Sequence, residues 1–188
     1  SNISTTTLVW SAFAACDGLD VYPEVMAAAE QWLRRRAGGL GSKHLSQAIT
    51  QRYGKDKTFS VPILTMCAIA GRFGEGRKAW ESITDLPFEL AALPPQWFAA
   101  LRLPVVSYAL PALIAIGQVK HHHAPSKNPL TRGLRKACRS MTLRRLSSIQ
   151  PSSGGFLEAT PLTSFVVMSL AASGEACLLY TSDAADEG

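Results

Sequence analysis

The chain has 188 residues, of which 47% are hydrophobic and 18% charged, and its formal net charge is +5 at pH 7. This length suits one domain with a sizeable core, or a piece of a larger protein. The longest apolar run, around residues 105–117, contains Pro111 and is shorter than the roughly 20 residues that span a bilayer. We therefore expect no transmembrane helix, and no signal-peptide pattern is visible.

The last residues, 177–188, depart from the pattern before them. They contain CLLYTSDAADE, which resembles a conceptual translation of a sequencing-library adapter, and we treat them as a non-native tail. We therefore expect residues 1–176 to be a fragment of the natural protein. Without Asp183, Asp186 and Glu187, 19 basic and 11 acidic residues remain, a net charge of +8.

Glycines, prolines and capping residues divide the chain into helices. In chain order, the expected helices cover residues 4–16, 23–36, 43–53, 60–70, 107–118, 130–149 and 161–174. Prolines interrupt the stretch before residue 104, where we expect three short helices at 80–83, 88–93 and 96–101. No segment shows sustained alternation of polar and apolar residues, so the sequence predicts an all-α chain.

The apolar helices alternate with more polar, Arg-rich ones. Each apolar helix is followed or ended by a glycine, and these glycines, 46 to 57 residues apart, are Gly18, Gly71, Gly117 and Gly174. Aligning the first apolar helix with the last places Thr7 on Thr163. This alternation is typical of stacked helical hairpins, in which one helix of each pair is buried and the other faces solvent.

The order of several segments resembles squalene–hopene cyclases, and specifically the N-terminal half of that family. The segments are QWLRRRAGG, TFSVPILTMCAIAG, LPFELAALP, LRLPVVSYALPALIAIG and IQPSSGGFLEATPLTSFVVMSLAASG. Within the last one, Gln150, Gly154, Gly155 and Phe156 are similar to the family's repeated Gln–Gly–Trp motif, with Phe156 near the Trp position. That motif joins an outer helix to an inner one.

The resemblance implies an α/α toroid, a double α-barrel that would be incomplete in this chain. It also implies carbocationic cyclisation of a linear polyprene such as squalene, an isomerase reaction of hopanoid biosynthesis, with no cofactor and no metal. The family's proton donor is an Asp in a DxDD motif, which residues 1–176 lack. We therefore assign no catalytic residue and expect the isolated fragment to be inactive, cytoplasmic and peripherally membrane-associated.

Four residues are candidates for the wall of a polyprene cavity. By resemblance, Tyr108 falls where relatives place a cavity-wall Trp, and its electron-rich ring could stabilise a carbocation. Leu113 follows on the same helix and is a candidate for the substrate entrance. Phe165 and Met168 lie three residues apart on the last helix. Plain core packing is the alternative for all four.

The basic helix at 130–149 carries a second candidate site. Arg132, Arg135, Lys136 and Arg139 follow the spacing i, i+3, i+4, i+7, and Leu134, Cys138 and Met141 are predicted to form the opposing apolar face. The four cations either form a solvated outer face or dock on anionic lipid headgroups. No aromatic residue interleaves with them, so nucleic-acid binding is not expected.

Two further features have simpler explanations. The triplet His121–His123 is predicted to be a solvated helix end, because three consecutive side chains cannot converge on one metal ion. Cys16, Cys67 and Cys138 lack paired spacing, which favours buried thiols in a reducing compartment. Two alternatives to a cyclase stay open: a non-catalytic toroid that binds a polyprenyl lipid, and a helical-repeat scaffold that binds other proteins. The sequence does not indicate the oligomeric state.

Overall fold

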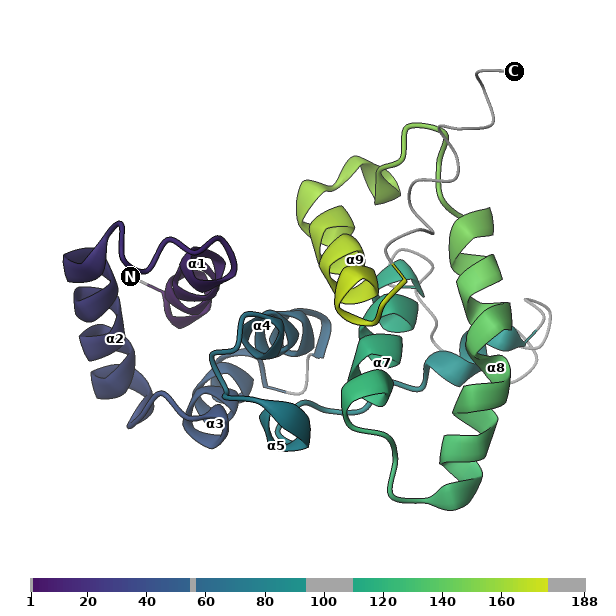
Figure 1. The fold of residues 1–188 in the computed structure, drawn as a ribbon, viewed down its shortest axis with the longest axis horizontal. Coiled ribbons are helices and arrows are strands. Elements are labelled where there is room, and N and C mark those ends of the chain that lie inside the picture. Colours follow the sequence, from purple (N-terminus) through teal and green to yellow (C-terminus); the bar gives the residue numbers. More distant parts are fainter. Residues whose placement is uncertain (1, 55–56, 94–109, 176–188) are drawn as a thin grey trace. The chain divides into compact units, whose positions relative to one another are not determined.

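The computed structural model of the chain describes residues 2–54, 57–93 and 110–175 (Figure 1). Every regular element within these ranges is a helix, so the prediction of an all-α chain is confirmed. The chain divides into two compact units, Ser1–Thr84 and Asp85–Gly188. None of the helices in the described ranges is both long and apolar enough to cross a bilayer.

The first unit contains five helices within the described residues. They are α1 (Ile3–Ala15), α2 (Pro23–Ala37), α3 (Ser42–Tyr53), α4 (Lys57–Ile69) and α5 (Gly76–Trp80). Helix α1 packs against α2 and α4, and α3 packs against α2 and α4. The first four helices begin and end within three residues of the predicted bounds. The short helix predicted at 80–83 lies instead at α5, and Ile83 N–H closes a turn onto Trp80 O at 3.2 Å.

The second unit packs three long helices around one apolar core. Its described elements are η1 (Phe88–Ala92), α7 (Leu110–His123), α8 (Pro129–Ser148), η3 (Phe156–Glu158) and α9 (Thr160–Ala172). Helix α7 contacts both α8 and α9, and η1 contacts α7 and α8 (Figure 1). The core contains Ile114 and Ala115 of α7, Leu143 and Leu146 of α8, Phe156, and Val166 and Leu170 of α9. The helix predicted at 96–101 lies outside the described residues.

Helix α7 is longer than the sequence predicts. It continues through Gly117 to His123, and Val119 and Lys120, which follow the predicted end at residue 118, are buried. Gly117 is therefore no helix end. A Cβ placed on Gly117 would lie 2.8 Å from Phe88 Cβ, closer than real Cβ contacts allow. The glycine lets the Phe88 ring of η1 approach the helix backbone.

Candidate functional site

The turn between α8 and α9 is held by the residues that resemble the Gln–Gly–Trp motif. The side-chain amide of Gln150 donates to Gly154 O at 3.1 Å, and Gly154 N–H donates to Pro151 O at 2.9 Å. Gly154 has a φ of 76°, a left-handed conformation that a residue with a Cβ adopts only at a cost. The Gln150 contact and this glycine conformation together reverse the chain at the end of α8.

Phe156 fixes this turn to the core. Its ring is buried against the apolar side chains of α7, α8 and α9. Its backbone N–H donates to Thr163 Oγ1 at 2.9 Å, which ties the turn to the first turns of α9. The aromatic residue near the motif's Trp position therefore anchors the structure, and its ring is not available to a ligand.

Helix α9 has two different faces. One face packs in the core through Val166, Ser169 and Leu170. On the other face, residues with the spacing i, i+3, i+4, i+7, i+8 line an open groove of about 570 Å³: Thr160, Thr163, Ser164, Val167 and Met168. Ser153 and Gly155 of the preceding turn complete its lining. We call these seven residues the α9 groove.

The α9 groove changes in character along the helix. Hydroxyl side chains lie toward the N-terminal end, and Val167 and Met168 lie toward the C-terminal end, with Val167 39% exposed. None of the seven residues is ionisable. Among the described residues, the groove therefore has no side chain suited to acid–base catalysis or to pairing with a charged ligand. Its chemistry suits an uncharged, largely apolar molecule.

Of the three predicted cavity residues that the structure describes, one lines the α9 groove. Met168 lines the α9 groove, whereas Phe165 and Leu113 are half-buried and are not among its lining residues. Tyr108 lies outside the described residues. Sequence reasoning missed Ser153, Thr160, Thr163, Ser164 and Val167. The helical spacing from residue 160 to 168 is the signal that could have found most of them.

A partly buried ionic cluster joins η1, α7 and α8 elsewhere in the second unit. Arg135 is only 6% exposed, and its Nε donates to Glu89 Oε2 at 3.0 Å. Its guanidinium also lies 3.5 Å from Asp85 Oδ2 and donates to Leu86 O at 3.3 Å. Lys120 Nζ of α7 lies 3.8 Å from Asp85 Oδ1. Two cations and two carboxylates therefore balance one another in this cluster.

The histidine triplet ends α7, but it is not a uniformly solvated end. His122 is exposed, whereas His121 packs near the Phe88 ring at 6.0 Å between centroids. His123 Nε2 lies 2.9 Å from Ala172 O at the end of α9. Burial, then the charge of Arg135, lowers the pKa of His121. The three side chains thus have different surroundings, and no group of three or more metal-ligating side chains occurs in the described part of the chain.

The predicted cationic face of α8 is wrong for one of its four residues, Arg135. Arg132 and Lys136 are exposed, but Arg135 is buried in the ionic cluster, and Arg139 bonds to Glu175 and to Ser173 O. The predicted apolar face is also wrong for Leu134 and Met141, which are 53% and 45% exposed, while Cys138 is buried. Glu89 on η1 and Asp85 just before it hold Arg135 inward, which leaves two apolar side chains, Leu134 and Met141, in solvent.

In the first unit, the polar atoms of the buried Trp10 and Cys67 side chains have hydrogen-bond partners. Trp10 Nε1 donates to Glu30 Oε1 at 3.0 Å, and the Arg72 guanidinium lies 4.2 Å above the Trp10 ring. Ser11 Oγ donates to Cys67 Sγ at 3.3 Å, and burial raises the pKa of the Cys67 thiol to about 12. Such a thiol is inert. Cys16, which was expected to be buried, is exposed.

Searches of protein-family models, of curated proteins and of solved structures found no match to the chain.

Proposed function

We propose that the chain is part of a squalene–hopene-cyclase-like triterpene cyclase, and that the α9 groove forms part of the wall along which a linear polyprene lies. The observation that carries this proposal is the second face of α9. The helix is highly apolar, yet the described residues of its unit leave Val167 exposed and Met168 only half-buried beside an open groove. An apolar helix face of this kind is stabilised by an apolar molecule placed against it.

The side chains of the groove suit a carbocation reaction. In such a cyclisation a carboxylic acid protonates a terminal alkene, the double bonds close rings in sequence, and loss of a proton ends the cascade. The cations formed on the way survive only where water and basic groups are kept away. Val167 and Met168 give the groove an apolar wall, and none of its described lining residues is ionisable.

The hairpin that carries the groove supports the same proposal. The exposed, basic α8 leads through the Gln150–Phe156 turn into the apolar α9, which is the outer-to-inner order of the cyclase motif. Closure of such hairpins into an α/α toroid is part of the proposal. The acid that starts the reaction is not among residues 1–176, which have no DxDD motif, so another part of the protein must supply it.

A binding experiment tests the proposal on the chain itself. Radiolabelled squalene in detergent micelles should bind the chain, and Val167→Asp or Met168→Asp should weaken binding at least about tenfold, because a carboxylate in an apolar contact must be desolvated. Val25→Asp is the matched control, because Val25 is also exposed and lies in the first unit. Equal binding by all variants would show that the groove does not hold the polyprene.

A second experiment separates the cyclase from the non-catalytic alternative. Within its complete parent protein, the chain should support conversion of squalene to cyclic products that gas chromatography and mass spectrometry detect. A folded parent that binds squalene through α9 and returns it unchanged favours a polyprenyl-lipid-binding protein.

A further inference from the structure

The connection between α1 and α2 presents several apolar side chains to solvent. Four of them lie close together along the chain and are 36–64% exposed: Leu19, Val21, Tyr22 and Val25. We call these four residues the α1–α2 patch. Single exposed apolar side chains are common on protein surfaces, but a group of them indicates a contact with another molecule.

The backbone that carries the α1–α2 patch is held by contacts within the first unit. Gly18 N–H donates to Phe13 O at 2.8 Å, which closes the end of α1. The Tyr22 ring meets the Phe13 ring edge-on, with 5.5 Å between centroids. At the start of α2, Met26 N–H donates to Tyr22 O at 3.0 Å, and the Met26 side chain is buried. These contacts fix the patch in its exposed position.

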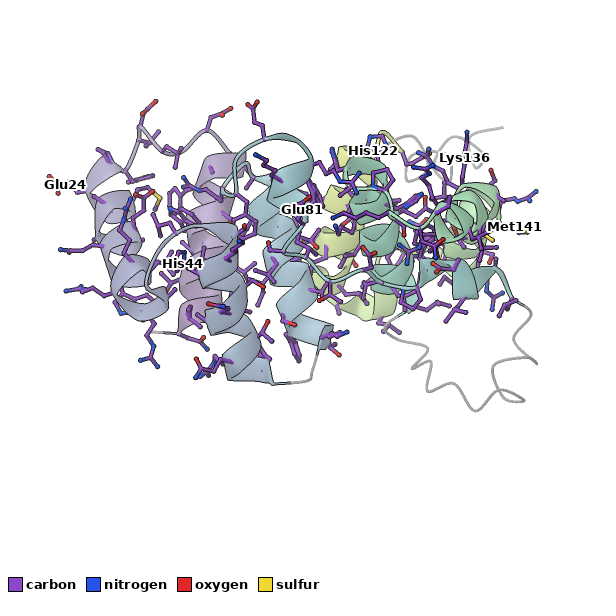
Figure 2. The ribbon with its side chains drawn as sticks, turned by 90° about the horizontal axis from the view of Figure 1, so that it is seen from below. Glu24, His44, Glu81, His122, Lys136 and Met141 are labelled. Atoms are coloured by element: carbon purple, nitrogen blue, oxygen red, sulfur yellow. The ribbon has the colours of Figure 1, made fainter. Side chains whose placement is uncertain are left out.

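Acidic side chains accompany the α1–α2 patch. Asp17, Asp20 and Glu24 are all exposed, and Figure 2 shows Glu24 pointing away from the other helices of the first unit. None of the three has an ion-pair partner among the described residues, whereas Glu30 Oε2 lies 3.6 Å from Arg34 Nη2. Arg34 is also the first Lys or Arg of the chain. The patch therefore combines apolar surface with uncompensated negative charge.

An open groove on α2 adjoins the α1–α2 patch. Its volume is about 560 Å³, and all its lining residues belong to α2: Ala27, Ala28, Glu30, Gln31 and Arg34. Ala28 comes three residues after Val25 and four after Glu24, so the groove begins on the side of α2 where the patch and its acids end. The short alanine side chains allow another helix to pack closely there.

We propose that the α1–α2 patch and this groove bind a basic amphipathic helix of a partner protein. Its aliphatic side chains contact the patch, and its Lys or Arg side chains pair with Asp17, Asp20 and Glu24. A helix that lays one apolar face into a groove is a recurrent mode of protein recognition.

The negative charge beside the patch decides the class of partner. Charges of opposite sign favour a basic partner and suppress an acidic one. Anionic lipid and nucleic acid both carry negative charge, so the three carboxylates repel them. A second copy of the chain placed patch against patch would bring the same acids together, which is also unfavourable.

The inference goes beyond the proposed function, because this contact requires neither a polyprene nor turnover. All the residues that carry it lie in the first unit, whereas the α9 groove lies in the second. Its test contains no squalene, so a failure here and a failure of the cyclase proposal are distinguishable.

Fluorescence anisotropy with two labelled model peptides tests the contact on the full chain. One peptide is an amphipathic helix of Leu and Lys, and the other has Glu in place of Lys. The chain should bind only the Lys peptide. Asp20→Asn/Glu24→Gln should bind it about fourfold more weakly, since an exposed ion pair contributes roughly twofold. Val21→Ser/Val25→Ser should also weaken binding, and both valines are exposed, so the fold should be kept.

A charge reversal and a matched control make the test stricter. Asp20→Lys/Glu24→Lys should lose the Lys peptide and gain the Glu peptide, a change that a purely structural role of the two acids does not explain. Glu75→Gln/Glu81→Gln removes two exposed acidic side chains elsewhere in the first unit. This control should bind the Lys peptide as well as the unaltered chain does.

Three results with the peptides would overturn the proposal: no binding of the Lys peptide, equal binding of both peptides, or an equal loss in the control. A folded charge-reversal variant that keeps the original preference would do the same. Self-association of the chain in light scattering that Val21→Ser/Val25→Ser abolishes would also overturn it, because the patch would then bind a second copy.

Discussion

Arg135 Nε donates to Glu89 Oε2 at 3.0 Å, and this contact fixes α8 against the short helix η1 inside the second unit. The same guanidinium lies near Asp85 and 5.6 Å from the centre of the Phe88 ring. One side chain thereby decides which side of α8 is buried. The inward position of Arg135 also explains why Leu134 and Met141 lie in solvent.

Removing the Arg135 side chain should therefore destabilise the fold strongly. Arg135→Ala leaves Glu89, whose side chain is only 13% exposed, without its counter-charge. The expected loss is about 3 kcal/mol in the free energy of unfolding. Urea unfolding followed by circular dichroism measures it. Lys136→Ala, one residue along and exposed, should change stability by less than about 0.5 kcal/mol. Equal unfolding midpoints for the two variants would contradict the buried ion pair.

Replacing either of two glycines by alanine should change the stability of the chain, but in opposite directions. Gly117→Ala should destabilise the chain by about 1–3 kcal/mol, because its Cβ would collide with Phe88. Gly133→Ala on α8 meets nothing within 4 Å and should stabilise it by about 0.5–1 kcal/mol through helix propensity. Thermal unfolding of both variants checks the prediction. A stabilising Gly117→Ala would show that Phe88 does not lie against α7.

The ring of His121 should make the second unit sensitive to mild acid. Burial, and then Arg135 and Arg139, lower its pKa, while Asp85 and Glu89 act in the opposite direction. Because the pKa in the folded state lies below the unfolded value of about 6.5, the neutral ring stabilises the fold above that pH, and this stability is lost as the pH falls through the folded-state pKa.

The urea concentration at the unfolding midpoint should accordingly decrease as the pH is lowered from 7.5 to 5.5, and His121→Gln should make that decrease smaller. Part of it should remain, because the pKa of His122 is also lowered, by burial first and by His123 next. Titration of the ring protons by NMR measures the two values directly. A pKa of His121 above that of an unfolded histidine would refute this explanation.

The hydrogen bond between the Phe156 N–H and the Thr163 hydroxyl should contribute much of the stability of the turn before α9. Thr163→Val leaves the Phe156 N–H without its acceptor, at an expected cost of about 1–3 kcal/mol. Hydrogen exchange at the Phe156 amide should become faster. Thr160→Val, at an exposed position of the same helix, should leave that exchange rate unchanged. Fast exchange in the unaltered chain would mean that the turn is open in solution.

Local signals in the sequence predict most helix positions correctly. Pro23 and Pro161 lie in the first turns of α2 and α9, and Gly38 ends α2 with a φ of 78°. The end of α7 could not be predicted in this way. Gly117 looks like a helix terminator, but it is needed for the approach of Phe88, and the sequence does not show that the two residues meet.

The orientation of α8 was predicted wrongly for a similar reason. A pattern of cations indicates a solvated face only when no acidic side chain packs against it in the fold. Glu89 pairs with Arg135 but is 46 residues away along the chain, so the sequence does not show that the two meet. The α9 groove was predicted through Met168 alone. Its hydroxyl residues share the helical spacing of Met168. From the sequence alone, however, a Ser or Thr that lines a groove looks the same as one that faces the core.

Photoaffinity labelling tests the central claim, that the second face of α9 holds a polyprene. A squalene analogue that carries a photoreactive diazirine is irradiated with the chain, and mass spectrometry maps the labelled residues. Labelling should concentrate on Val167 and Met168 within α9, decrease when unlabelled squalene competes, and disappear from a folded Val167→Asp variant. Labelling that avoids α9, or that Val167→Asp leaves unchanged, would contradict the claim.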